Sequence, residues 1–358
     1  MTRRELAFVI ALALLSVLAM AQMALSYPEN VRLGYTSCAS CHVSPTGGGV
    51  LTNYGRSSAE ELSSFAREGD GDLLGKLHLP DRVAVGGDAR YVSFRAGQYD
   101  RHFPMQSDAE VAVHPTDEVW IAASAGMYGE QRATEIRRNY VYWTPSPAAS
   151  LRLGKFYPAY GIMVPDHTIA TRAGLGYGQG QETYNAEVSW HGRRGDLTLT
   201  PTWGVDERVR LGSTTGYRWT TGDTGGTARA TWYLGDRSLV GASGKYRRAH
   251  GVDTMAYGGY LSAGLTRDLY VLSETDYQAD SDHARKLVSY TEVGWEVARG
   301  FHPQLTHEAD HEYGTTTSHK LGVALQWLPL VHWELYTRAQ YEVIPHVWAY
   351  TLLGHYYW

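Results

Sequence analysis

From about residue 81 to the C-terminus, apolar and polar residues alternate in stretches of about ten residues. Successive side chains of a β-strand point to opposite faces, so each stretch has one apolar face and one polar face. The clearest stretch runs from Trp333 to Val343, and its polar face carries Glu334, Tyr336, Arg338, Gln340 and Glu342. A tilted strand of about ten residues is long enough to cross a bilayer. The alternation therefore predicts strands that meet lipid on one side and water on the other.

The spacing of these stretches indicates how they are connected. We count sixteen candidate strands, which start near residues 82, 105, 118, 136, 149, 183, 195, 226, 238, 254, 268, 286, 301, 318, 332 and 347. Short turns follow the even-numbered strands, and longer polar loops generally follow the odd-numbered ones, above all Pro158–Glu182 and Asp206–Gly225. Outer-membrane barrels have short periplasmic turns and long external loops. We therefore predict an all-β fold: a transmembrane antiparallel β-barrel of about 16 strands over residues 81–358, in the bacterial outer membrane, with both termini in the periplasm.

The composition agrees with a barrel better than with other β-rich folds. The chain has 26 Tyr, 11 Trp and 39 Gly, and aromatic residues with polar tips are typical of the two rims of a membrane barrel. A secreted β-sandwich would need more aliphatic residues in its core, and a propeller would show a blade-length repeat, which the sequence lacks. The chain ends on Trp358, which resembles the terminal aromatic signal of outer-membrane barrels. A net charge of −5 excludes a strongly basic nucleic-acid binder.

Residues 1–26 have the layout of a cleaved signal peptide. Arg3 and Arg4 precede an apolar run from Leu6 to Met20, and small residues follow this run. The alternative is a retained membrane anchor, but the run is shorter than the roughly 20 residues that a spanning helix needs. Cleavage would fall after Ala21 or after Ser26, and we place the short leader in front of the barrel at residues 27–80.

The leader contains both cysteines of the chain, in the sequence CASCH at residues 38–42. This is the spacing of a c-type haem attachment site. Two thiols at this separation add to the two vinyl groups of one porphyrin, and the adjacent imidazole ligates the iron as the proximal ligand. We therefore predict one covalently attached haem c, bound through Cys38 and Cys41, with His42 on the iron. The alternatives are a periplasmic disulfide and a zinc site that would combine His42 with the distant His78.

The sixth ligand of the iron is less constrained by the sequence. No methionine lies between Tyr27 and Pro80, and the other histidine in that range is His78. His78 is our first choice for the distal metal ligand, with His102 and Met105 behind it. An open or water-ligated iron is the remaining alternative. A methionine ligand would have to come from the barrel.

The leader is too short to enclose a porphyrin by itself, because chains of about 50 residues have marginal cores even without a cofactor. A barrel of about sixteen strands has a lumen wide enough to be a water channel. We therefore expect the leader to plug this lumen. Within it, we expect a flexible turn at Pro45–Gly49 and a short helix at Ala59–Arg67.

These features together resemble the fused monohaem cytochrome–porins of the outer membrane, best known as ferrous-iron oxidases of iron-oxidising bacteria. The matching residues are Cys38, Cys41 and His42, followed by LTNYGR, Leu51–Arg56. The second motif is similar to the Leu-Asn-x-Phe-Gly-Arg box of that family, with Tyr54 in the Phe position. The PTGGG insertion lengthens the spacing between the two motifs, and the barrel is shorter than is usual in the family.

The resemblance implies an electron conduit in the outer membrane. An extracellular donor, Fe(II) or another redox metal, would give one electron to the haem, and a periplasmic c-type cytochrome would accept it, as in an Fe(II):cytochrome c oxidoreductase. One alternative is a porin whose haem plug is structural or sensory, and another is electron export to an extracellular acceptor. The sequence shows no nucleophile–base pair and no phosphate-cradling loop, so we assign no catalytic residue.

Two further groups of side chains bear on this function. Inward-facing acidic residues of the later strands could draw a cation into the lumen, but we interpret them as a wet wall. These residues are Glu274, Asp276, Glu292, Glu308, Asp310, Glu312, Glu334 and Glu342. External loops also contain residues that could hold iron briefly. These are Asp166, His167, His250, Asp253, Asp282 and His283.

Overall fold

A computed structural model of the chain describes residues 28–65, 80, 82–129, 133–178, 180–211, 214–220, 222–315 and 317–358. The predicted signal peptide and the candidate ligand His78 lie outside these residues.

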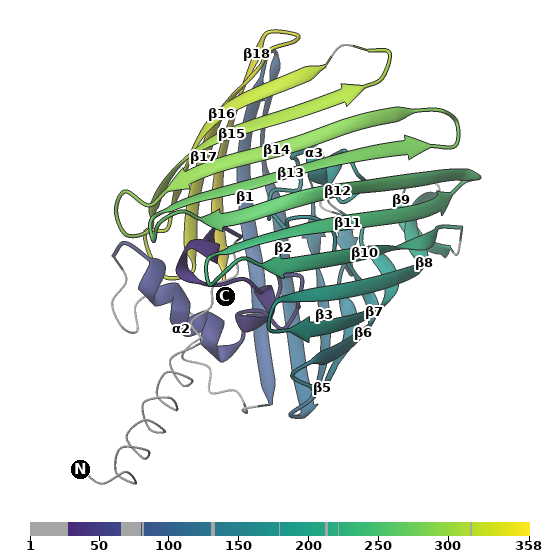
Figure 1. Ribbon diagram of the computed structural model, residues 1–358, viewed down its shortest axis with the longest axis vertical. Helices are drawn as coiled ribbons and strands as arrows, with labels where there is room; N and C mark the ends of the chain where they lie inside the picture. The colour runs from purple at the N-terminus through teal and green to yellow at the C-terminus, as the bar shows by residue number, and fades with distance from the viewer. Residues whose placement is uncertain are drawn as a thin grey trace.

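Sixteen antiparallel strands form a closed wall in the described part of the chain (Figure 1). They are β1 (Val83–Ala96), β2 (Tyr99–Thr116), β3 (Val119–Tyr128), β5 (Asn139–Ser146), β6 (Ala149–Phe156), β7 (Thr183–Gly192), β8 (Gly195–Leu211), β10 (Thr224–Tyr233), β11 (Ser238–Ala249), β12 (Val252–Gly264), β13 (Leu269–Asp280), β14 (Arg285–Trp295), β15 (Phe301–Glu312), β16 (Ser318–Trp327), β17 (Trp333–Glu342) and β18 (Val347–Tyr357). Each strand pairs with the next, and β1 pairs with β18, which closes the sheet. The predicted barrel and its strand number are confirmed.

Two shorter strands extend the wall at the end away from the leader. These are β4 (Ala133–Glu135) and β9 (Thr214–Thr220). β9 pairs with the last part of β8, from Val205↔Thr220 to Leu211↔Thr214. The predicted loop over Asp206–Gly225 is therefore wrong for most of its length, because its β-branched and aromatic residues continue a hairpin.

The outer face of the barrel is apolar. Leu305, Leu321, Val323 and Leu352 are each more than half exposed there. Tryptophans lie near the strand ends on the leader's side of the wall: Trp143, Trp190, Trp232, Trp295, Trp327 and Trp333. Tyrosines lie near the strand ends on the other side: Tyr246, Tyr257, Tyr277 and Tyr341. An apolar band between two aromatic girdles is the outer surface of a barrel that sits in a bilayer.

The described part of the leader packs in one opening of the barrel, beside the C-terminus (Figure 1). It forms η1 (Pro28–Leu33), η2 (Cys38–Ser40) and α2 (Asn53–Leu62). Val31 of η1 is buried among lumen-facing side chains that include Tyr270 and Leu272. The guanidinium of Arg32 contacts Glu296 of the wall at 2.7 Å. The leader therefore occupies this end of the lumen, as its length led us to expect.

Beyond α2, the leader is hydrogen-bonded to the turn between β16 and β17. The backbone N–H groups of Ser64 and Phe65 donate to carbonyl oxygens of that turn at 2.8 and 2.9 Å. The predicted helix over Ala59–Arg67 is wrong at both ends, because α2 begins after the Thr52 cap and ends at Leu62. Among the described residues, we find no helix with the length and apolar character that crossing a membrane requires.

The connection between β6 and β7, residues 157–182, folds into the lumen instead of standing outside it. We call it the lumen loop. It contains α3 (Ala170–Ala173), and the adjacent Ile169 is fully buried. The prediction that Asp166 and His167 stand in an external loop is therefore wrong, and the carboxylate of Asp166 pairs with Arg338 of β17 at 2.7 Å. The other predicted loop residues lie in or beside turns at the outer end: His250, Asp253, Asp282 and His283.

Candidate functional site

The cysteine motif lies on a small hairpin of the leader. The backbone of His42 pairs with that of Leu51 in an antiparallel bridge. The turn between them contains Gly47–Gly49, whose φ angles are +78°, +70° and +74°. Glycine adopts positive φ without the steric penalty that a Cβ brings. The PTGGG insertion is thus the tight turn that returns the chain to the cysteine motif.

This turn brings the LTNYGR box against the cysteine motif. The N–H of Thr52 donates to the carbonyl of Cys41 at 2.8 Å, and its hydroxyl accepts from the N–H of Gly55 at 3.1 Å, which caps α2. A Cβ on Gly55 would lie 2.4 Å from the carbonyl oxygen of Cys41. Arg56 donates to the carbonyl of Val85 in β1. Three residues of the box therefore hold α2 against Cys41 and against the wall.

The barrel wall surrounds this hairpin. The guanidinium of Arg152 donates to the hydroxyls of Ser44 and Thr46, both at 3.1 Å. Val43 and Val50 are buried in one cluster with wall residues. The wall residues of this cluster are Ala112, Ala122, Tyr140, Tyr142 and Phe156. The cysteine motif is therefore enclosed by strands that lie far from it in the sequence.

A cavity of about 1540 Å³, partly open to solvent, lies between the leader hairpin and the lumen loop. We call it the inner cavity. Cys41 and His42 line it from the leader, and Trp358 lines it from the C-terminus. The lumen loop contributes Met163, Val164, Pro165, His167 and Arg172.

Cys41 and His42 in the lining of the inner cavity are of the types that would hold a covalent haem, while Cys38 is not a lining residue. Cys38 and Cys41 are both free thiols, so they form no disulfide. The Nδ1 atom of His42 is buried and has no hydrogen-bond partner among the described residues. Burial lowers the pKa of the His42 imidazole to about 4, so the ring is neutral, which is the form that ligates a metal. Across the described residues, no group of three His, Cys, Asp or Glu is arranged to hold a metal ion.

A second cavity, of about 2210 Å³ and also partly open to solvent, extends along β1 and β15–β18. We call it the outer cavity. Its lining runs from Phe94 and Val347 near the outer strand ends to Glu29 of η1. Some residues line both cavities, so the two are adjacent. These residues are Arg90, Val164, Pro165, His167 and His355.

The candidate distal ligands from the barrel do not lie in the inner cavity. His102 is at the outer end of β2, where its side chain is 55% exposed beside Asp100. Met105 lines the outer cavity. These two predictions therefore have no support from the geometry. His102 alternates along β2 with Arg101 and Phe103, which line the outer cavity, and it lines neither cavity itself.

Three other side chains of the inner cavity belong to types that ligate iron. His355 already contacts a carboxylate at each ring nitrogen, Glu334 at 2.7 Å and Asp88 at 3.0 Å. Met163 and His167 come from the lumen loop, and neither contacts a carboxylate within hydrogen-bond distance in the described part of the chain. The lumen loop is therefore the source of possible distal ligands in this cavity.

We expected the inward-facing acidic residues to form a water-exposed wall, but most of them are buried. Five of them are between 1% and 7% exposed: Glu274, Asp276, Glu292, Glu308 and Glu334. Two of these carboxylates anchor the lumen loop, since Glu274 accepts from the N–H of Ile162 at 2.9 Å and Glu308 from the N–H of Ala170 at 2.8 Å. Those nearer the outer end are partly or fully exposed: Asp310, Glu312 and Glu342.

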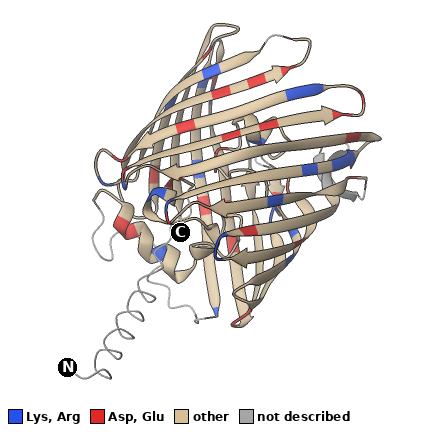
Figure 2. Ribbon diagram, viewed as in Figure 1, with Lys and Arg blue, Asp and Glu red and all other residues tan. Residues whose placement is uncertain are grey.

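Basic residues hold the other end of α3. The ammonium groups of Lys245 and Lys286 donate to the carbonyls of Leu175 and Gly174, where the helix ends. Positively charged groups interact favourably with the partial negative charge at the C-terminal end of a helix. Acidic and basic residues are interspersed on the strands of this side of the wall (Figure 2). The lumen loop is therefore fixed by charges of both signs, each at the matching end of α3.

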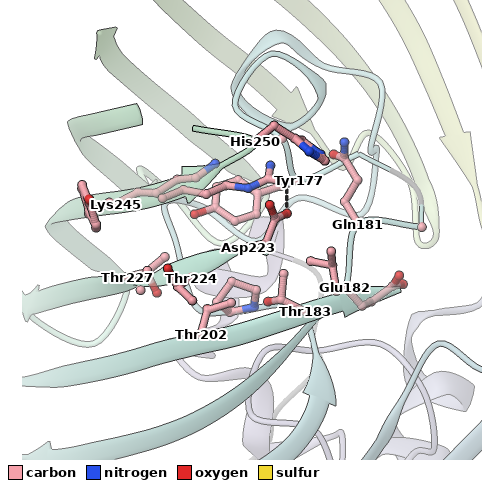
Figure 3. A pocket seen from close by; sticks show the side chains of 18 residues that line it. Tyr177, Gln181, Glu182, Thr183, Thr202, Asp223, Thr224, Thr227, Lys245 and His250 are labelled. Atoms are coloured by element: carbon pink, nitrogen blue, oxygen red, sulfur yellow. Dashed lines mark hydrogen bonds and ion pairs between the residues drawn. The ribbon is translucent and has the colours of Figure 1, made fainter. Parts of the chain in front are cut away.

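A third cavity, of about 890 Å³, lies beside this attachment, between the lumen loop and β7, β8, β10 and β11. Figure 3 shows Tyr177 and Gln181 of the loop together with Lys245 and Asp223. The ammonium of Lys245 is 4.6 Å from the ring centre of Tyr177. Arg247 pairs with Asp223. The contact of Lys245 with Tyr177 attaches the second half of the loop to the wall.

No protein-family model and no curated protein matches the sequence. Several solved outer-membrane structures match the fold. In-vitro folded OmpT of Vibrio cholerae has a TM-score of 0.59 at 11% identity, covering 77% of this chain and 99% of that chain. The anion-selective porin from Comamonas acidovorans has a TM-score of 0.56 at 9% identity, covering 77% and 99%. The outer membrane channel DcaP of Acinetobacter baumannii has a TM-score of 0.52 at 11% identity, covering 77% and 97%.

The chain has the fold of an outer-membrane porin.

Within this porin fold, the site combines residues that the sequence singled out with others that it did not. Cys41 and His42 share the inner cavity, and Cys38 begins η2 just before them. Met163 and Arg172 were missed, and His167 was assigned to an external loop. The one signal in the sequence was the length of the Pro158–Glu182 connection, because long connections in compact proteins often have a function.

Proposed function

We propose that this protein is an outer-membrane electron conduit of the fused monohaem cytochrome–porin type. It passes single electrons between an extracellular donor, Fe(II) in the first instance, and a periplasmic c-type cytochrome. One observation carries the proposal: Cys41 and His42 of a c-type haem motif line a cavity inside a porin-type barrel.

Haem c, when bound, supplies reversible one-electron transfer. Cys38 and Cys41 would hold it covalently, and His42 would ligate its iron. Met163, whose sulfur accepts from Arg172, and His167 are the lumen-loop side chains of this cavity that could also ligate iron. The wall and the leader bury part of the attachment site, since Cys41 and Val50 are both 0% exposed, whereas Cys38 is partly exposed.

The outer cavity gives a small donor a route toward this site. It adjoins the inner cavity at Val164, Pro165 and His167 of the lumen loop. The wall residues Arg90 and His355 also line both cavities, so the loop and these two side chains separate a donor in the outer cavity from the site. An electron can cross the loop without the donor moving into the inner cavity. The lumen loop therefore keeps the metal ion outside while the electron crosses.

The leader and the C-terminus lie at the same end of the barrel, which also has the short turns (Figure 1). We assign this end to the periplasm. The exposed Ala39 of η2 lies between the two attachment cysteines, so a soluble cytochrome can approach the haem closely from this side.

A pyridine haemochrome assay on wild type and Cys41→Ala tests the proposal. After expression with a working cytochrome-maturation system, wild type gives a covalent c-type spectrum, and Cys41→Ala gives a weakened spectrum or none. If both proteins are colourless, the proposal is refuted. Stopped-flow mixing of the coloured protein with Fe(II) then tests the donor, and rapid haem reduction is the expected result.

The porin-type fold favours a second candidate, a passive porin whose haem plug is structural or sensory. Ion conductance in planar bilayers, with a haem spectrum that Fe(II) leaves unchanged, supports this candidate. Electron export uses the same parts in reverse. It is supported instead if an extracellular acceptor oxidises the haem and Fe(II) does not reduce it.

A further inference from the structure

Arg172 is a buried guanidinium without an anionic partner among the described residues. It lies on α3 of the lumen loop, is 7% exposed and lines the inner cavity. Its guanidinium donates to the sulfur of Met163 at 3.6 Å, and its Nε has no partner in the described part of the chain. The ring centres of Tyr157 and Tyr177 lie 5.4 and 5.9 Å from the guanidinium carbon, which compensates a buried charge only in part.

The other arginines that line the inner cavity each have a carboxylate within salt-bridge distance. The pairs are Arg90 with Asp88 at 2.7 Å, Arg138 with Glu110 at 2.9 Å, and Arg137 with Glu135 at 3.2 Å. Arg172 thus differs from its neighbours in the same cavity. A buried charge with no counter-charge in direct contact is destabilising, and Glu274 acts on Arg172 only from beyond salt-bridge distance.

An anionic ligand bound in the inner cavity would supply the partner that Arg172 lacks in the protein itself. The planar fork of a guanidinium matches the two oxygens of a carboxylate. The porphyrin assigned to this cavity carries two propionate carboxylates, at the edge remote from its attached vinyl groups. These carboxylates also need partners where water is excluded.

We infer that Arg172 binds a propionate of the porphyrin, so that the lumen loop contributes a positioning residue to the haem site. This inference rests on the proposed function and adds the loop to the machinery that orients the cofactor. Arg172 also holds a positive charge beside the haem, which favours the reduced form.

Redox titration of Arg172→Gln, Arg172→Lys and Arg338→Gln in detergent tests the inference. Arg338 is the matched control, because it is also a lumen-facing arginine that touches the loop, but it pairs with Asp166 and does not line the inner cavity. Arg172→Gln keeps its covalent haem, because both cysteines remain, and its midpoint potential falls. Arg172→Lys recovers most of this fall. Arg338→Gln stays close to wild type.

A second readout covers the case in which Arg172→Gln does not fold. The propionate bending bands of the resonance Raman spectrum report hydrogen bonds to the haem carboxylates, so they shift in Arg172→Lys and not in Arg338→Gln. Unchanged bands in Arg172→Lys, or equal potential shifts in Arg172→Gln and Arg338→Gln, overturn the inference.

The redox titration also distinguishes a haem propionate from a free anion as the partner of Arg172. If added acetate changes the potential of wild type as much as the Arg172→Gln substitution does, Arg172 binds a free anion instead, and the inference fails. If wild type contains no covalent haem, the proposed function fails and the inference fails with it. If wild type is coloured and the Arg172 variants match it, the inference fails alone.

Discussion

Replacing Gly55 by alanine should loosen α2 from the cysteine motif, although alanine is the better helix former. In an exposed helix interior this change stabilises by about 1 kcal/mol. Here the new Cβ would lie 2.4 Å from the carbonyl oxygen of Cys41 and 3.0 Å from its Cα. Because non-bonded carbon atoms prefer about 3.5 Å, α2 has to move by roughly 1 Å. Overpacking of this kind costs about 1–3 kcal/mol, so after the gain in helix propensity we expect docking of the leader to weaken by up to about 2 kcal/mol.

A change of this size raises the undocked fraction of the leader by up to about 30-fold. Limited proteolysis in detergent measures this fraction, because cleavage of a transiently opened segment follows its equilibrium population. The barrel should keep its heat-modifiable mobility on gels, and the haem content should fall. Ser57→Ala is the control, since Ser57 lies on the exposed side of the same helix. A Gly55→Ala leader as resistant to protease as wild type would refute the contact with Cys41.

Three further predictions concern the other attachments inside the barrel. Arg32→Met breaks a buried contact with Glu296, which costs about 3 kcal/mol and should speed proteolysis of the leader by about 100-fold. Burial and the nearby Glu292 raise the pKa of Glu29 from 4.5 to about 8. Because the folded leader binds this proton more tightly than the unfolded one, its docking should weaken as the pH rises from about 4.5 to about 8, and Glu29→Gln should abolish that dependence in the same proteolysis assay. Glu308→Ala removes the acceptor for the N–H of Ala170, so the lumen loop should swing more freely and ion conductance in planar bilayers should increase, whereas equal conductance would argue against this anchor.

The wall of the barrel could be predicted because each strand is specified by the pattern of its own neighbouring residues. Side chains of a strand alternate with a period of two, so Glu334 and Arg338 had to face one side and Trp333 the other. In the structure Glu334 is buried and Trp333 is exposed, as expected. That Cys41 and His42 lie at one site could also be predicted, because the two residues are neighbours in one short motif.

The lumen loop could not be predicted in the same way. Its inward course depends on carboxylates such as Glu274 and Glu308, which lie more than one hundred residues later in the chain. Asp166 has the sequence surroundings of an external loop, and only the distant Arg338 shows that it faces inward. Long-range ion pairs leave no periodic pattern in the sequence, so the residues that complete the inner cavity were missed for this reason.

Trp358, the last residue, exchanges two backbone hydrogen bonds with Gly87 of β1, both at 3.1 Å, and lines the inner cavity together with Cys41. The pocket is thus bounded by the leader and by the last residue of the chain. It is complete only when β18 has paired with β1. A haem bound there, as we propose, would therefore acquire its final surroundings only when the barrel closes, so the surroundings of the iron and closure of the barrel would be established in one assembly event.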